Sequence, residues 1–446
     1  MTLLPPWQCP YLDDNQKRCL IRMLDGDTPN VFIAWWKMGT GKTRLGLAAF
    51  DYSGYDDLIL VCRRISFDDW ILEMETCGLD YMVFENNYNP SSIVRFAHTK
   101  NPRRVLLVSA GDLKSVPEYY PKGQMLIVDE LYLFGNPQSR RSTLIQRISL
   151  FCSARLGLSG TIMPAGDNST IFGQCMALQA HRFLAPTLSK FKGKFQMMAK
   201  GRYGKKFLQR PGANEEITKL LAPMVDVYMP EGRPTVKQIL SCAKNKKQAN
   251  AIAQLQDEYE YGNTTYDYAL QIVHVVNGIS NGWHDHGESV EFLPSTKCEK
   301  TLALIDDLVS SGERVVVWCA YHNDIARISS ELKHPWLEFT ARVPFDRTTW
   351  EKGDVKVVLA TEANGASVNH FAHVKYAIYY SLNYKLLDLQ QSMMRHERKN
   401  SEHDGTHYYF MQTRGSFDAR AHYLVTESDK SEKELVMSLV GELFPN

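Results

Sequence analysis

The sequence lacks the features of a membrane-spanning, exported or disulfide-bonded protein. No apolar run approaches the roughly 18–20 residues needed to cross a bilayer, and the N-terminus has no basic segment followed by an apolar core. Its nine cysteines are scattered, without a CxxC pair or metal-ligand spacing, so we predict neither zinc nor disulfides. We therefore expect a cytoplasmic protein with free thiols and no membrane partner.

An excess of charge of one sign is also missing. The formal net charge is +1 over 446 residues, although 23% of them are charged. A nucleic-acid surface would therefore have to be a local basic stripe that acidic faces elsewhere balance. The length and the 44% hydrophobic content allow two or three domains with sizeable cores.

Short apolar runs alternate with longer periodic stretches, and this pattern occurs twice. Apolar runs of this kind are typical of strands buried on both faces, and the periodic stretches between them are typical of helices. The first series of strands is expected at residues 30–36, 57–62, 104–109, 124–130 and 155–160. The second is expected at 313–320, 354–361 and 374–381, with a helix at 323–332. The sequence thus predicts an α/β protein with two parallel sheets.

Between the two series the composition shifts toward lysine, glutamine and tyrosine, over about residues 188–294. We interpret this segment as a helical insert and linker. The expected domains are 1–187, the insert at 188–294, and 295–446.

A glycine-rich segment follows the first expected strand and precedes a helical stretch. Its residues are Met38, Gly39, Thr40, Gly41, Lys42 and Thr43. Glycines let backbone amides approach phosphates, the lysine adds a cation at the β- and γ-phosphates, and the threonine hydroxyl can ligate Mg²⁺. Trp36 stands where the usual leading glycine would be, and a plain glycine-rich helix cap is the alternative. We predict an ATP site here.

Two carboxylates, Asp129 and Glu130, follow the apolar run at residues 125–128. One can hold Mg²⁺ through water while the other polarises the attacking water. The alternative is a solvated turn. We predict Asp129 as a metal ligand and both residues as catalytic.

Two arginines, Arg395 and Arg398, lie three residues apart near the C-terminus and share one helix face. Such a pair suits an arginine finger that reaches the γ-phosphate from a second domain. An exposed basic helix has the same pattern, so the interpretation stays open at this point.

In this order the motifs resemble the superfamily 2 helicases, and within them the SNF2-like branch. Gln16 resembles the upstream adenine-reading glutamine, and Trp70 with Glu73 resembles the W-x-x-E form of the next motif. Further similar segments are residues 129–132, the Ser159-Gly160-Thr161 motif, residues 295–332, residues 361–369 and residues 391–398. The sequence departs from the family at Tyr132, where the family has histidine, and at Met394, where it has glycine.

The resemblance implies two RecA-like domains that clamp ATP and Mg²⁺, with Lys42, Asp129, Glu130, Arg395 and Arg398 catalytic. It places Arg44 and Gln391 among the ATP contacts, and Ser159, Gly160 and Thr161 in the coupling of hydrolysis to movement. It implies DNA contacts through Ser109, Thr361, Asn364 and Asn369. Arg63 and Arg64 could add phosphate contacts or only solvate a strand end.

The expected function is an ATP-dependent DNA translocase or helicase that remodels branched or duplex DNA. Compact motors of this size resemble phage-encoded SNF2-like and UvsW-type branch-migration helicases, so a monomer in a host cytoplasm is expected, with replication or recombination proteins as further partners. An RNA helicase of the same superfamily is one alternative. A nucleotide-gated scaffold without sustained hydrolysis is another, and a DNA-binding module with an incidental phosphate loop is a third.

Overall fold

The chain forms two compact units, residues 1–230 and 231–446, each built around one parallel sheet in this computed structural model. The structure describes residues 5–25, 30–86, 90–99, 103–115, 124–161, 163, 167–201, 204–228, 230, 234–258, 260–261, 264–265, 269–361, 371–383, 385–397, 401, 403–416, 418 and 422. The two parallel sheets confirm the predicted fold class. Within the described residues, no helix has the length and apolar character needed to cross a membrane.

The sheet of unit 1 has seven strands in the order β3-β4-β2-β5-β6-β1-β9. Their bounds are β1 Val31–Trp36, β2 Asp57–Cys62, β3 Met82–Asn86, β4 Arg104–Ser109, β5 Gln124–Val128, β6 Ala154–Ser159 and β9 Val225–Tyr228. The central strands β2, β5 and β1 are almost wholly buried, as expected for apolar strands covered on both faces. Because β5, β6 and β1 are neighbours, the segments that follow them meet at one edge of the sheet.

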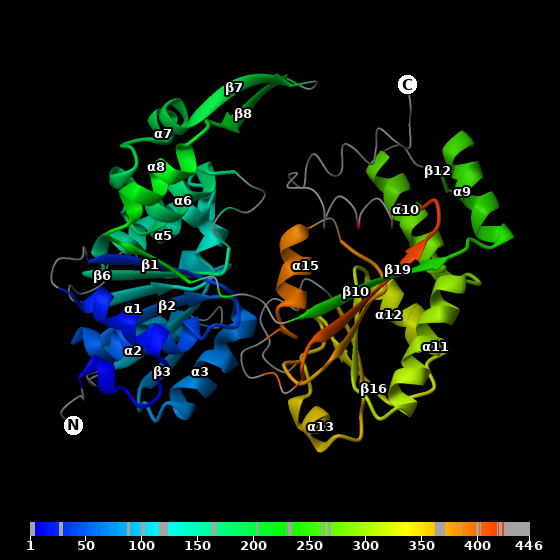
Figure 1. Ribbon diagram of the computed structural model, residues 1–446, viewed down its shortest axis with the longest axis horizontal. Helices are drawn as coiled ribbons and strands as arrows, with labels where there is room; N and C mark the ends of the chain where they lie inside the picture. Colours follow the sequence, from blue (N-terminus) through cyan, green and yellow to red (C-terminus); the bar gives the residue numbers. More distant parts are fainter. Residues whose placement is uncertain are drawn as a thin grey trace. The chain divides into compact units, whose positions relative to one another are not determined.

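Helices cover both faces of this sheet (Figure 1). One face packs on α1 Asp14–Leu24, α2 Lys42–Ser53 and α3 Phe67–Thr76. The other packs on α4 Pro90–His98, α5 Arg140–Phe151, α6 Ser169–Ala177, α7 Leu188–Phe195 and α8 Ala213–Leu221. A two-stranded hairpin, β7 Gln196–Gly201 and β8 Gly204–Gln209, extends from the end of α7.

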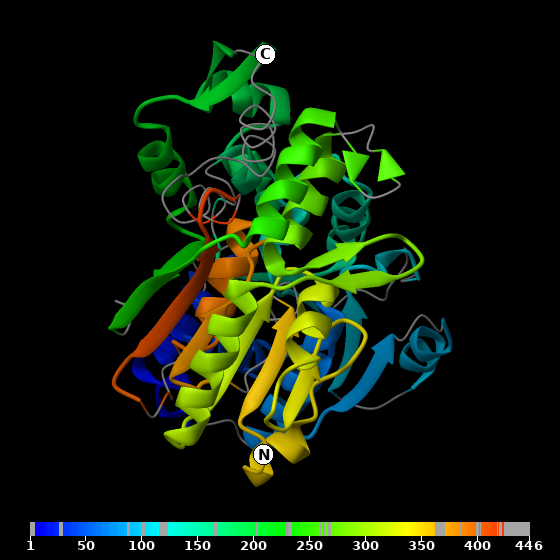
Figure 2. The same cartoon turned by 90° about the vertical axis from the view of Figure 1, so that its right-hand side faces the viewer.

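Unit 2 has six parallel strands in the order β10-β19-β18-β15-β17-β16. Their bounds are β10 Thr235–Cys242, β15 Val315–Cys319, β16 Trp336–Phe339, β17 Val357–Thr361, β18 Tyr376–Tyr379 and β19 Thr406–Thr413. One face packs on α11 Thr296–Ser310 and α12 His322–Ser329, which lie in front of the strands in Figure 2. The other packs on α9 Lys246–Glu258, α10 Ala269–Asn281, α13 Arg347–Lys352 and α15 Leu386–Met393.

Residues 188–294, which we expected to be a helical insert and linker, are divided between the units. The division follows Pro230, and the segment contains strands as well as α7 to α10. Strand β9 joins the sheet of unit 1 beside β1, whereas β10 joins that of unit 2 beside β19. The part of this segment that belongs to unit 2 also forms two small hairpins. They are β11 Glu260–Tyr261 with β12 Thr264–Thr265, and β13 Trp283–Asp285 with β14 Val290–Phe292.

Candidate nucleotide site

The loop between β1 and α2 has the conformation that its glycines allow. Gly39 and Gly41 have φ angles of 76° and 85°, in the left-handed region that side-chain-bearing residues rarely adopt. The Lys42 ammonium folds back over the loop and donates to the carbonyl oxygens of Trp36, at 3.0 Å, and Lys37, at 3.3 Å. The Thr40 hydroxyl donates to the same Lys37 oxygen. Lys42 and Thr43 then begin α2, so a cation and a helix N-terminus lie at one place.

Gln16, predicted to read adenine, is anchored against this loop. Its side-chain amide donates to the carbonyl oxygen of Gly41 at 2.9 Å, and its side-chain oxygen accepts from the backbone N–H of Asp13 at 2.8 Å. The second contact belongs to a capping box that starts α1. A methyl group on Gly41 would lie 2.3 Å from the Gln16 amide nitrogen, so the contact is as close as a glycine permits. In this structure Gln16 ties α1 to the phosphate loop.

Asp129 and Glu130 follow β5 at the same edge of the sheet. One oxygen of Asp129 accepts from the Trp70 indole N–H at 3.3 Å, and the other accepts from the Glu130 backbone N–H at 2.9 Å. Glu130 has φ 52° and ψ 51°, a left-handed conformation for a residue with a side chain, and it is nearly buried. Such a conformation costs about 1–3 kcal/mol and is found preferentially at functional sites.

The Ser159-Gly160-Thr161 turn, at the end of β6, lies directly beside the phosphate loop. A methyl group on Gly160 would lie 2.6 Å from Met38 Cγ and 3.5 Å from Lys42 Nζ. The Ser159 hydroxyl closes the turn, since it donates to the Thr161 carbonyl oxygen at 2.7 Å. The predicted coupling residues therefore contact the loop that carries Lys42.

Arg44 serves to fasten two helices together. It forms an ion pair with Glu73, at 2.5 Å, which joins α2 to α3. Trp70 and Glu73, two residues of the W-x-x-E motif, thus contact Asp129 and Arg44 respectively. Sequence resemblance marks this motif, but its role as a support for the site is visible only in the fold.

The predicted nucleic-acid residues of unit 1 have protein partners. Arg63 donates to the Tyr132 hydroxyl at 2.6 Å, and Arg64 pairs with Glu85 at 3.1 Å. The Ser109 hydroxyl is buried and accepts from the backbone N–H of Gly111 at 3.2 Å. The structure thus joins Arg63 to Tyr132, one of the positions at which the sequence departs from the family that it resembles.

In unit 2, two of the residues predicted to complete the ATP site are buried. Gln391 lies in α15 and is fully buried, and Arg395 follows the helix with 7% of its surface exposed. The neighbouring His396 accepts from the Trp318 indole N–H and bonds the Val374 carbonyl oxygen, and burial lowers its pKa to about 4. It is therefore a neutral core residue at pH 7. Arg398, Asn364 and Asn369 lie outside the described residues.

A cavity of about 350 Å³ lies at the carboxyl ends of β15 and β17. Thr361, a predicted nucleic-acid residue, lines it together with the rings of His274, Trp283 and Tyr321. These three rings are in mutual edge contact, with centroids 5.0–5.7 Å apart. Sequence reasoning missed the aromatic residues because they come from α10, β13 and the end of β15, and no local pattern connects them.

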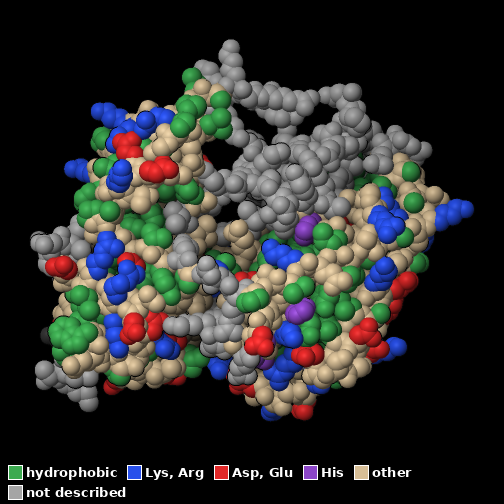
Figure 3. Space-filling model, viewed as in Figure 1, with side chains coloured by type: hydrophobic (Ala, Val, Ile, Leu, Met, Phe, Trp, Pro, Cys, Tyr) green, Lys and Arg blue, Asp and Glu red, His purple; other side chains and the backbone are tan. Residues whose placement is uncertain are grey.

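Among the described side chains around α7, basic groups lie beside an acidic one and an aromatic ring. Lys194 and Arg210 both pair with Glu216, at 3.0 and 2.7 Å, and the Lys192 ammonium lies over the Phe207 ring. Figure 3 shows basic and acidic side chains mixed over this part of unit 1.

Comparisons with known proteins bear on the fold. No family model and no curated protein matches this sequence. Similar solved structures include the Sulfolobus solfataricus SWI2/SNF2 ATPase core in complex with double-stranded DNA, which is 14% identical, with 99% of this chain and 96% of that chain covered and a TM-score of 0.43. The core domain from the same organism is 13% identical, with 96% and 93% covered and a TM-score of 0.39. Likeness at this level does not establish a shared activity, so function has to be inferred from the site.

Proposed function

We propose that this protein is an ATP-dependent motor that acts on DNA. The observation that carries the proposal is the meeting of three segments at one edge of unit 1: the loop with Lys42, the carboxylates Asp129 and Glu130, and the turn at Gly160. At one edge of the sheet, this combination supplies a cation, a pair of carboxylates and a turn that can respond to loss of the γ-phosphate. These are groups that hydrolysis of a nucleoside triphosphate uses.

The roles follow from the chemistry of each group. The Lys42 ammonium, which now binds two loop carbonyls, would transfer to the β- and γ-phosphates when ATP enters. Glu130, held in its left-handed conformation, would accept a proton from the attacking water. The turn at Gly160 would respond to loss of the γ-phosphate because it contacts Met38 and lies near Lys42.

Magnesium fits the donor atoms at this edge. The Thr43 hydroxyl and the Asp129 carboxylate are hard oxygen donors, and Trp70 already orients the carboxylate. Bound with ATP, Mg²⁺ would neutralise charge on the phosphates.

Unit 2 supports the assignment of nucleic acid as the partner. The cavity beside Thr361 is lined by the rings of His274, Trp283 and Tyr321 and lies at the carboxyl edge of a parallel sheet, the usual place for ligands in such folds. Aromatic rings bind bases with little sequence preference, as a motor on DNA requires. Action on forked or branched DNA, as a monomer and alongside replication or recombination proteins, is the finer form of the proposal.

A pair of substitutions tests the site. Lys42→Ala should abolish both ATP binding and hydrolysis, whereas Glu130→Gln should keep ATP binding and lower hydrolysis by about 100-fold or more, because the amide keeps the shape and loses the base. Lys190→Ala, an exposed lysine of α7 in the same unit, is the matched control and should leave both unchanged. Sustained hydrolysis by pure Lys42→Ala protein would remove the phosphate-loop assignment.

A further inference from the structure

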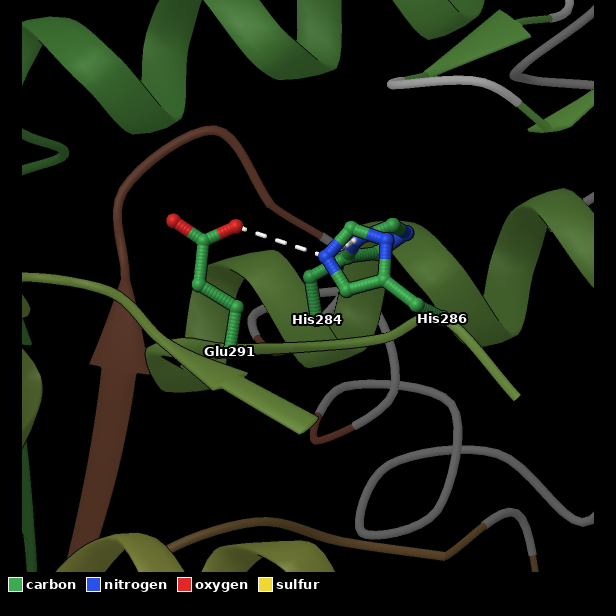
Figure 4. A group of neighbouring side chains, drawn as sticks. All are labelled: His284, His286 and Glu291. Carbon is green, nitrogen blue, oxygen red and sulfur yellow. Dashed lines mark hydrogen bonds and ion pairs between the residues drawn. The ribbon is translucent and has the colours of Figure 1, made fainter. Parts of the chain in front are cut away.

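The hairpin β13–β14 brings three metal-binding side chains to one face. His284 lies in β13, and His286 directly follows the end of that strand. Glu291 on β14 lies directly opposite His284 in the antiparallel register. Figure 4 shows the two imidazole rings and the carboxylate turned toward one another across the hairpin.

The turn of the hairpin holds this arrangement. The backbone N–H of His286 donates to the Ser289 carbonyl oxygen at 2.9 Å, and Gly287 has a left-handed φ of 86°. The Asp285 carboxylate accepts from the Gly287 N–H and from Asn323 at the start of α12, at 2.8 and 3.4 Å. The turn is therefore closed by its own hydrogen bonds, and its contact with Asn323 holds it against α12 in unit 2.

The separations between the donor atoms fit a tetrahedral ion. Nδ1 of His284 lies 3.2 Å from Nε2 of His286, and that Nε2 lies 3.4 Å from Oε2 of Glu291. All three donor atoms lie within 4.8 Å of one another. Zinc bonds of about 2.0–2.1 Å in tetrahedral geometry place neighbouring ligand atoms about 3.3 Å apart, which agrees with both separations.

The carboxylate of Glu291 is held in place from its outer side. The Lys247 ammonium donates to Oε1 at 3.0 Å, while Oε2 faces the histidines. His286 is exposed, so an ion can reach the cluster from solvent.

We propose that His284, His286 and Glu291 bind one Zn²⁺ ion, with water as the fourth ligand. Cysteine spacing gives no sign of this site, since none of its ligands is cysteine. The ion would fasten both strands of the hairpin whose first residue, Trp283, lines the aromatic cavity and donates to the buried Asp324 at 2.6 Å. The inference is independent of the proposed motor function.

The test uses the full chain, stripped of metal with a chelator and then titrated with Zn²⁺ against a chromophoric competitor. One Zn²⁺ should bind per chain, and Co²⁺ in its place should give the visible absorption of a tetrahedral site. His286→Ala and Glu291→Gln should each weaken binding by about 100-fold, while circular dichroism stays that of the parent. His334→Ala, which removes a half-buried histidine paired with Asp306 in the same unit, is the control and should bind as the parent does.

Three results would overturn the proposal. They are the absence of stoichiometric binding, binding that His286→Ala and Glu291→Gln leave intact, and Co²⁺ absorption of an octahedral ion. Thermal unfolding provides a second readout, because Zn²⁺ should raise the Tm of the parent protein and of His334→Ala but not of His286→Ala. An equal rise in all three would place the ion elsewhere.

Discussion

Substitution of Gly160 by alanine tests the contact between the turn after β6 and the phosphate loop. The added methyl group would lie 2.6 Å from Met38 Cγ, closer than two carbon atoms can approach, so Met38 and the loop that carries Lys42 must move. Overpacking of this kind costs about 1–3 kcal/mol. If that cost falls on the ATP-binding conformation, kcat/KM for ATP should drop by about 5- to 150-fold.

A second substitution separates this explanation from a general loss of stability. Met38→Ala removes the Cγ atom that the methyl group meets, so the double variant should recover most of the lost kcat/KM. Gly193→Ala, at an open position in α7, adds the same methyl group and should leave ATP hydrolysis unchanged. Full activity of Gly160→Ala, or a double variant no better than the single one, would refute the reasoning.

Two further predictions concern Arg63 and His396. Because Arg63 is bound to the Tyr132 hydroxyl, Arg63→Ala should leave the salt dependence of DNA binding unchanged. In a Tyr132→Phe background, Arg63→Ala should lower ATP hydrolysis no further. If the slope of log affinity against log salt instead falls by about 1, Arg63 is a phosphate contact. His396 has a pKa of about 4 when folded and about 6.5 when unfolded, so it favours the folded state at pH 7 and this stability is lost as the pH falls between those values. Between pH 7 and pH 5 the unfolding free energy of unit 2 should fall by about 2 kcal/mol through this residue. Urea unfolding of His396→Gln should not show this loss. An equal pH dependence in both proteins would contradict the buried, neutral state of His396.

Most of the central strands could be predicted because they are buried on both faces and consist mainly of apolar residues. The strands at the edges could not be predicted, because they are more exposed or shorter than the central ones. Strand β10 is largely exposed and contains polar residues throughout, and β9 has only four residues. Their places beside β19 and β1 are decided by pairing between residues far apart in the sequence, which a local pattern does not record.

The candidate site shows the same division. The glycines and Lys42 of the phosphate loop are neighbours in the sequence, so their chemistry could be inferred from it. The partners of Arg44 and Arg63 lie 29 and 69 residues away, and these contacts engage side chains that we had expected to bind a ligand. An arginine beside such a site can either bind a ligand or hold the protein together, and only the fold distinguishes the two roles.

The most direct test of the motor function is the steady-state rate of ATP hydrolysis, measured at one low salt concentration. The rate should be compared without nucleic acid and with single-stranded DNA, duplex DNA, forked DNA, four-way DNA and duplex RNA. The account predicts strong stimulation by DNA, greatest with forked or four-way DNA, and none in Lys42→Ala protein. Equal stimulation by duplex RNA would contradict the choice of DNA, and the absence of hydrolysis with every nucleic acid would contradict the motor itself.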